Sequence, residues 1–120
     1  MPDPTLSSGV FDWVRIPAQP TKAGELRAYF DAATRTLDRL ETHVTTLNPG
    51  EISHPAHAHA DEELIIVKEG TVEATIKGVA RQAGPGSVFF FASHDLHGLR
   101  NPGKVHACYH VIRIFPRNLA

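Results

Sequence analysis

Glycine and proline interrupt this sequence at short intervals, which limits the chain to short elements of secondary structure. The interrupting positions are Pro17, Pro20, Gly24, Pro49, Gly50, Pro55, Gly70, Gly78, Gly84, Pro85, Gly86, Gly98, Pro102 and Gly103. The stretches between them are rich in β-branched and aromatic residues, which favour strands. Turn signals repeated about every 8–12 residues are typical of β-sandwiches and barrels. The sequence therefore predicts an all-β fold.

Five strands can be named from these stretches. They are Leu40–Leu47, Glu63–Lys68, Thr71–Lys77, Ser87–Phe91 and Ala107–Phe115. The Glu69-Gly70 pair between the second and third strands predicts a turn, and with it a hairpin. The stretch Gly24–Ala33 suits a helix by composition, but its Tyr29-Phe30 pair would suit a strand as well. No internal repeat or linker divides the chain, so we expect a single domain.

The stretch Leu64–Val67 is apolar at every position and does not alternate between apolar and polar residues. A strand of this kind is typically covered on both faces, whereas the outer strand of a barrel is normally half polar. Either the N-terminal arm of this chain or a second subunit could supply the cover. We therefore expect a homodimer in which the N-terminal strands pack against the partner's sheet and protect an open edge.

Length, composition and charge exclude several classes of protein. A chain of 120 residues has the size of one ordinary domain. Its 42% hydrophobic and 21% charged residues give a normal globular balance. The net charge is −1, and the twelve lysines and arginines are scattered. Without a basic stripe to neutralise a phosphate backbone, nucleic acid is not an expected partner.

Nothing in the sequence predicts export or a membrane span. The first nine residues contain neither a basic nor a long apolar region, so they do not predict a signal peptide. The longest apolar runs, Leu64–Val67 and Val88–Ala92, are too short to cross a bilayer. Cys108 is the only cysteine, which excludes an intrachain disulfide and agrees with a reducing compartment. We therefore expect a cytoplasmic protein with no membrane partner.

Histidine is the unusual residue type, with eight in a chain that has one methionine and one tryptophan. Two short clusters hold five of them: His54, His57, His59, His94 and His97. In an extended strand, His57 and His59 would emerge on the same face, about 6.5–7 Å apart. Glu63 has the same parity, so its carboxylate would reach the same side. Such a group could bind one metal ion, although a lone His-x-His also occurs on strands for structural reasons alone.

The segment from Gly50 to Gly70 resembles the first conserved motif of the cupin superfamily. That motif runs from a glycine through His-x-His to a glutamate and then to a second glycine. His57, His59 and Glu63 occupy the three polar positions. Six residues separate Gly50 from His57 where five are usual, a difference that a loop absorbs.

The segment Gly86–Asn101 resembles the second cupin motif, in which a glycine opens a strand and a histidine is followed four residues later by an asparagine. His97 and Asn101 occupy the last two of these positions. Ser87 stands where an acidic residue is usual. Both motifs occur in order and together span residues 50–101.

The resemblance implies a cupin-type double-stranded β-helix, also called a jelly-roll barrel. We expect residues 37–120 to form this barrel and residues 1–36 to form an N-terminal arm and strands that pack on it or on a partner. The resemblance further implies one divalent metal ion, and its ligands are His57, His59, Glu63 and His97.

The implied donor set, three neutral imidazoles and a carboxylate, leaves two positions open on an octahedral ion. Those positions are where water, dioxygen or a bidentate small molecule would bind. The same donors suit Fe, Mn, Ni, Zn or Cu, and the sequence does not choose among them.

Two further histidines are candidates for acid–base chemistry. His54 precedes the first motif's ligands and could assist proton transfer at the mouth of the site, or lie as a solvated loop residue. His94 lies near His97 and could act as an acid or base, or be exposed in its loop. His43 and His106 belong to no motif and receive no role.

The later strands offer candidate wall residues. Tyr109 and His110 are adjacent on one strand, so one of them faces the barrel interior, where it could bind a substrate or pack as a wall residue. The inward members of Phe89–Phe91 would line an apolar cavity. Arg100 and Arg113 could clamp a substrate carboxylate or pair with acidic side chains on the surface.

The resemblance implies metal-assisted chemistry on a small organic molecule. A dioxygenase-like reaction is our first expectation, with isomerase, lyase and decarboxylase activities as alternatives. A module that binds a metal or small ligand without turnover is the competing hypothesis, because one fold hosts both and the activity depends on the site.

Overall fold

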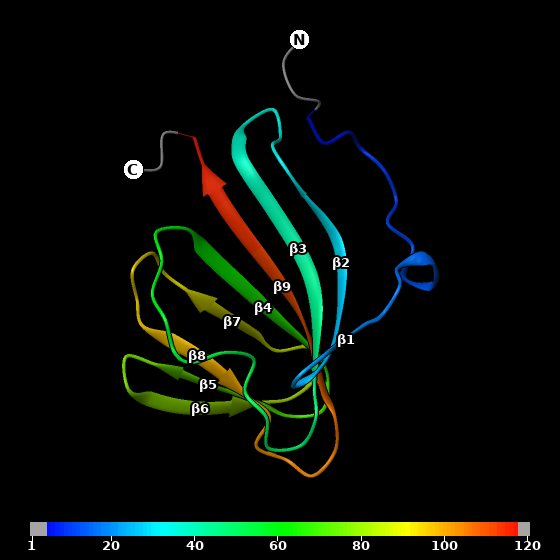
Figure 1. Cartoon of the computed structure of the whole chain (residues 1–120). Helices are drawn as coiled ribbons and strands as arrows, with labels where there is room; N and C mark the ends of the chain where they lie inside the picture. The colour runs from blue at the N-terminus through cyan, green and yellow to red at the C-terminus, as the bar shows by residue number, and fades with distance from the viewer. Residues whose placement is uncertain (1–4, 118–120) are drawn as a thin grey trace.

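The computed structural model describes residues 5–117 and consists of two antiparallel sheets packed against each other (Figure 1). Residues 1–4 of the expected N-terminal arm and residues 118–120 of the expected barrel lie outside the described residues. The all-β prediction and the jelly-roll architecture are both confirmed.

One short 3₁₀ helix and nine strands make up the described chain. They are η1 (Trp13–Arg15), β1 (Gln19–Thr21), β2 (Gly24–Ala32), β3 (Leu37–Leu47), β4 (Glu62–Glu69), β5 (Val72–Ile76), β6 (Val79–Ala83), β7 (Val88–Phe91), β8 (His97–Arg100) and β9 (Ala107–Pro116). The larger sheet has the order β1-β2-β3-β9-β4-β7, and the smaller has the order β6-β5-β8. The strands β1 and β2, from the segment before residue 37, therefore continue the larger sheet.

The five strands named from the sequence correspond to β3, β4, β5, β7 and β9. The ambiguous stretch at residues 24–33 is a strand, since β2 pairs along its length with β3. The hairpin expected at Glu69-Gly70 is wrong. Strand β4 pairs with β7 and β9, whereas β5 pairs with β6 and β8 in the other sheet. The turn at residues 69–70 carries the chain from one sheet to the other.

Gly70 is required at that crossing for two reasons. Its φ of +73° lies in the left-handed region, which residues with a Cβ rarely adopt. A Cβ at this position would also lie 2.5 Å from the carbonyl oxygen of His106, on the chain that leads into β9. The crossing thus runs too close to its neighbour for any side chain.

The core lies between the two sheets and takes alternate residues from each strand. Ile65 faces inward and is paired with Val111 of β9 and Phe89 of β7. Tyr109, two residues before Val111 on β9 and paired with Val67, is also inward and only 1% exposed. His110 points to the other face, where its ring stacks on Tyr29 at 6.1 Å. Tyr109 is therefore the inward member of that pair.

The segment before β1 covers part of the outer face of the larger sheet. The ring of Trp13 lies between the guanidinium of Arg27 on β2 and the ammonium of Lys68 on β4, at 4.3 and 4.6 Å. Beneath this region Val44 is only 1% exposed. The cover does not extend to Ile66, which is 36% exposed on the same face. Within one chain, the predicted cover of residues 64–67 is therefore incomplete.

No helix among residues 5–117 has the length and apolar character needed to cross a membrane.

Candidate metal centre

The four histidine and glutamate residues of the two motifs converge from three separate parts of the fold. Glu63 lies on β4, and His97 begins β8. The parity argument assumed that His57 and His59 lie on one regular strand. They lie instead in the loop between β3 and β4. His57 is nevertheless held firmly, because its backbone exchanges two hydrogen bonds of 2.9 Å with that of His97.

One potential ligand atom from each of the four residues lies within 4.8 Å of the other three. Nε2 of His59 is 3.0 Å from Oε1 of Glu63, and Nε2 of His97 is 3.5 Å from the same oxygen. The three imidazole rings stand nearly edge-on to one another, with centroids 4.8–4.9 Å apart. One nitrogen from each ring therefore lies close to the Glu63 carboxylate, around a common point.

Backbone carbonyls determine which ring nitrogen of two histidines faces that point. Nδ1 of His97 lies 2.9 Å from the carbonyl oxygen of Asp95, and Nδ1 of His59 lies 3.0 Å from that of Asp61. A carbonyl oxygen can only accept a hydrogen bond, so each Nδ1 is the protonated nitrogen. Nε2 is therefore the nitrogen of each ring that remains to face a metal ion.

Two imidazole nitrogens of the cluster test whether its residues fit a metal ion. Nε2 of His57 and Nε2 of His97 are buried and have no hydrogen-bond partner among residues 5–117. A buried polar atom left without a partner costs about 1–3 kcal/mol, so a native fold rarely keeps two side by side. A divalent cation at the centre would satisfy both nitrogens and the Glu63 carboxylate. The residues fit such an ion.

The electrostatic environment keeps His57 in the form that binds metals. Burial, which has the largest effect, and then the neighbouring His54, His97 and His59 together lower the pKa of His57 to about 4. The ring is thus neutral at pH 7. Metal ligation requires this form, because a protonated imidazole has no free lone pair.

A buried ion pair supports His59 from behind. Asp61 is 2% exposed, and one of its carboxylate oxygens lies 3.0 Å from Nδ1 of His59. Arg113 donates two hydrogen bonds to the same carboxylate, at 2.7 and 2.8 Å. Burial would raise the pKa of Asp61, but the hydrogen bonds and charge of Arg113 outweigh it and hold that pKa below its usual value. Asp61 is therefore an anion that orients both side chains.

The same contacts decide between the alternatives for the two arginines. The guanidinium of Arg113 is occupied by Asp61 of this chain. Arg100 pairs with Glu73 at 3.2 Å on the exposed side of the smaller sheet.

Phe91 is the inward phenylalanine nearest the cluster, and its ring stacks on His97 at 4.0 Å.

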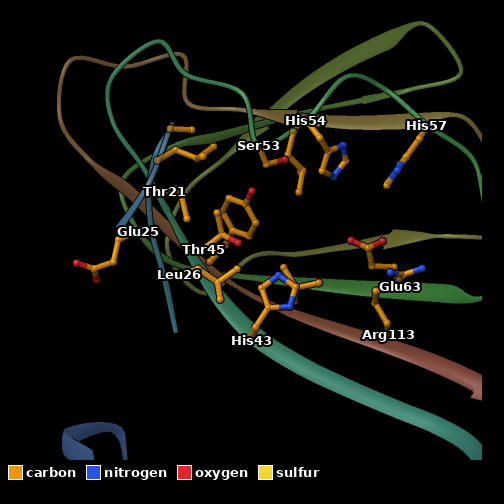
Figure 2. Close-up of a pocket in the computed structure, with 15 residues that line it drawn as sticks. Thr21, Glu25, Leu26, His43, Thr45, Ser53, His54, His57, Glu63 and Arg113 are labelled. Carbon is orange, nitrogen blue, oxygen red and sulfur yellow. The ribbon is translucent and has the colours of Figure 1, made fainter. Parts of the chain in front are cut away.

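A cavity of about 260 Å³ opens beside the cluster, with His57 and Glu63 in its wall (Figure 2). Figure 2 shows Ser53 and His57 on the loop at one side of this cavity and His43 on the sheet at the other. Pockets for drug-sized ligands are typically about 300–1,000 Å³, so this cavity suits a smaller molecule. Two of the four candidate ligands, His57 and Glu63, thus face a partly open cavity.

The two candidate acid–base histidines occupy different positions relative to this cavity. His54 lines it, and its exposed ring lies 4.0 Å from the ring of His57. His94 is exposed with a φ of +66°, and its backbone amide donates to the carbonyl of His59 at 2.7 Å. Its side chain is outside the lining of the cavity. His94 therefore supports the His59 loop through its backbone.

Sequence reasoning missed His43, which lines the cavity and whose Nδ1 donates a 2.7 Å hydrogen bond to a carboxylate oxygen of Glu41. A signal for it existed. His43 shares the parity of Thr45 and Leu47 on β3, and both of these also line the cavity. Histidine on the inward face of a barrel strand could have been singled out on that ground.

Comparison with known proteins places these features in a family. A family model described as the cupin domain matches residues 43–113, more than half of the chain, and this range contains all four candidate ligands. No curated protein matches the chain.

Many solved structures share the fold. KdgF from Halomonas sp. matches with a TM-score of 0.74 and 18% identity over 93% of this chain and 97% of that chain. A predicted oxalate decarboxylase from Thermotoga maritima matches with a TM-score of 0.70 and 17% identity over 89% and 99%. The cupin domain of an XRE-family transcriptional regulator from Enterobacter cloacae matches with a TM-score of 0.59 and 26% identity over 65% and 83%. With the fold, both motifs and the clustered donors in agreement, the chain belongs to the cupin family.

Proposed function

We propose that this protein is a metal-dependent enzyme that acts on a small, partly apolar organic molecule, with a dioxygenase-like reaction as the specific form. One divalent ion would be held by His57, His59, Glu63 and His97. The observation that carries the proposal is the pair of buried, unpartnered imidazole nitrogens beside a ligand-sized cavity. A site with no cation to bind would have no reason to keep them.

A divalent ion bound there supplies Lewis acidity and open coordination positions for a ligand. The residues of the chain do the rest. Asp61 holds the His59 ring in its ligating tautomer. Leu99 and Val111 line the cavity with apolar surface that excludes water. His54, with its ring at the exposed mouth, is placed to take or give a proton.

We propose Fe(II) or Mn(II) as the native ion. The donor set combines nitrogen and oxygen without a thiolate, which suits these ions at least as well as zinc. Cys108, the single cysteine, is buried and lies on the opposite face of β9 from Tyr109, so it is not a ligand.

The test begins with elemental analysis of the full chain after expression without added metal. The protein is then loaded anaerobically with Fe(II) and challenged with diols, diketones, thiols and uronates, while oxygen uptake and new products are followed. The proposal expects one divalent ion per chain and oxygen-dependent conversion of at least one compound. The variant His97→Ala is the matched control, which should retain the β fold and lose both the ion and the activity.

The competing function is a module that binds a small ligand without turnover. The cupin domain of the Enterobacter cloacae regulator supports this alternative, since its name assigns it to a transcriptional regulator. Tight reversible binding of one compound, with no oxygen uptake and no product, would replace the enzyme proposal with this one. The structural matches below 25% identity establish the fold alone and favour neither function.

A further inference from the structure

Two hydroxyl groups of residues that line the cavity beside His57 and Glu63 have no hydrogen-bond partner within the described part of the chain. Tyr109 extends from the inner face of β9, is 1% exposed, and contributes a hydroxyl without a partner. Ser53, on the loop that leads to His57, contributes a second buried hydroxyl in the same condition. Figure 2 shows Ser53 on the same side of the cavity as His54. The cavity is the space into which both hydroxyls can bond.

Packing alone does not explain these groups. Phenylalanine and alanine would fill the same volumes without burying an unsatisfied hydroxyl, which is costly in a protein interior. Burial is the dominant effect on the Tyr109 phenol and raises its pKa to about 12, although the neighbouring hydroxyls of Ser53 and Thr45, which lie outside hydrogen-bond geometry, act to lower it. The phenol thus remains protonated at neutral pH and can donate as well as accept.

The position of Tyr109 separates it from the metal ligands. On the inner face, Glu63 is paired with Arg113, and Val67 is paired with Tyr109. These two rows are four residues apart on both strands, or about 13 Å along the sheet. A ligand in the cavity could therefore reach the metal with one end and the two hydroxyls with the other.

The charges around the cavity indicate what the far end of such a ligand can be. Among the described residues that line the cavity, Arg113 is the only lysine or arginine. Its Nε and Nη2 both donate hydrogen bonds to the Asp61 carboxylate. Glu25 adds a negative charge to the lining. An anionic group at the far end would thus meet no free cation, whereas a neutral oxygen would meet two hydroxyl groups.

We propose that Tyr109 and Ser53 form a recognition site for a neutral oxygen, a hydroxyl or carbonyl group, at the end of the ligand remote from the metal. The inference rests on the proposed function for the metal end and extends it by naming the ligand class. That class is a small molecule with a metal-chelating group at one end, a short apolar middle and an uncharged oxygen at the other end.

Three probes with six carbons each and a chelating 2-oxo acid end test this site. They are 2-oxohexanoate, 6-hydroxy-2-oxohexanoate and 2-oxoadipate, which end in a methyl group, a hydroxyl group and a carboxylate. Binding to the Co(II)-loaded full chain is followed by its visible absorption. We expect the hydroxyl probe to bind about tenfold more tightly than the methyl probe, the difference typical of one satisfied buried hydrogen bond. The carboxylate probe should bind more weakly than the hydroxyl probe.

The variants Tyr109→Phe and Ser53→Ala should each reduce the preference for the hydroxyl probe and leave the affinity for the methyl probe unchanged. Tyr29→Phe is the matched control. Tyr29 is the only other tyrosine and stacks on His110 at the outer face, so this variant should keep the full preference. Equal affinity for the hydroxyl and methyl probes, tighter binding of the carboxylate probe, or no binding of any probe to metal-loaded protein would overturn the inference.

A second measurement does not depend on the metal. Because the Tyr109 hydroxyl has no hydrogen-bond partner in the part of the chain that the structure describes, Tyr109→Phe should leave the Tm of the ligand-free chain unchanged or raise it. A clear fall in Tm would show that the hydroxyl has a structural bond and would also overturn the inference. Metal content is measured on the same samples. Failure to take up metal would contradict the proposed function, and the Tm comparison would then decide the inference by itself.

Discussion

Asp61 contacts His59, a candidate metal ligand, and Arg113 at once, and its effect on the site can be isolated by a single substitution. Asp61→Asn removes the negative charge that faces both Arg113 and Nδ1 of His59, and it leaves the backbone carbonyl that accepts from Nδ1 in place. Loss of such a supporting carboxylate typically weakens metal affinity about 10–100-fold. We expect a loss in that range, measured by competition with a chelating dye.

A matched control for this substitution exists on the surface. Asp31 also makes two hydrogen bonds to an arginine, Arg39, at 2.6 and 2.8 Å, but the pair is exposed and makes no hydrogen bond to a candidate ligand. Asp31→Asn should leave metal affinity unchanged. Equal affinities for the Asp61 and Asp31 variants would show that the buried pair has no part in the metal centre.

The lowered pKa of His57 predicts how the metal-free protein responds to acid. In the unfolded chain this histidine takes up a proton near pH 6.5, whereas in the fold it does so only near pH 4. Between these values the unfolded state binds more protons, so the free energy of unfolding falls as the pH falls through this range. Urea unfolding of the metal-free chain at pH 7 to 4 should show this decline.

The variant His57→Asn should flatten that decline, because asparagine does not titrate. His106→Asn serves as the control, since His106 is exposed outside the cluster, and its slope should match that of the unchanged protein. Identical slopes for all three proteins would contradict the assignment of the acid sensitivity to His57.

At the scale of the element, the crossing from β4 to β5 depends on Gly70. Gly70 and Gly78 both have positive φ, at +73° and +84°, but a Cβ would strike backbone only at Gly70. Gly78→Ala should therefore cost about 1–2 kcal/mol from the left-handed backbone alone. Gly70→Ala should cost clearly more, because the carbonyl of His106 must also move. Urea denaturation of the two variants measures the difference, and equal costs would refute the close approach.

The same crossing shows that local sequence does not determine which strands pair with each other. Glu69-Gly70 is a sound turn signal, but a turn within one sheet and a turn between two sheets have the same composition. Pairing partners distant in the chain decide between them, and these could not be read from residues 63–77. Strand β6 was missed for a related reason, since four of its five residues are exposed and show no apolar alternation.

The candidate site was more predictable than the strand pairing. All four ligands were named from the two motifs, although His57 and His59 lie in a loop and not on one strand face. The support behind them could not be predicted, because Asp61 and Arg113 are 52 residues apart in the sequence. Likewise, adjacency told us that one of Tyr109 and His110 faces inward, but the register with β4 was needed to say which.

At the scale of the whole molecule, the outer face of the larger sheet has an apolar region that the N-terminal segment leaves open. We name it the outer patch, and it comprises Leu64, Ile66, Val88, Phe90 and Ile112. The strand register makes it continuous, since Leu64 is paired with Phe90 and Ile112, and Ile66 is paired with Val88. Phe90 is 51% and Val88 57% exposed. Monomeric proteins rarely expose contiguous apolar surface of this kind.

We propose that a second copy of the chain covers the outer patch. A two-fold interface places the same surface of both copies against each other, and an apolar patch without charges can pair with itself in this way. The patch includes the edge strand β7, so its burial would also protect that edge from unwanted pairing. Exposed Val10 and Val14 in the N-terminal segment could add apolar contact at the margin of such an interface.

This proposal predicts that the chain has twice the monomer mass in light scattering at micromolar concentration. Phe90→Glu places a charge in the centre of the outer patch and should shift the protein to the monomer, because a buried unpaired carboxylate is costly. Val79→Glu is the control, since Val79 is 59% exposed on β6 of the other sheet and should not affect assembly. Metal content should survive in both variants, because neither residue faces the cluster. A monomeric mass for the unchanged protein would refute the dimer, and a dimeric Phe90→Glu variant would place the interface on another face of the molecule.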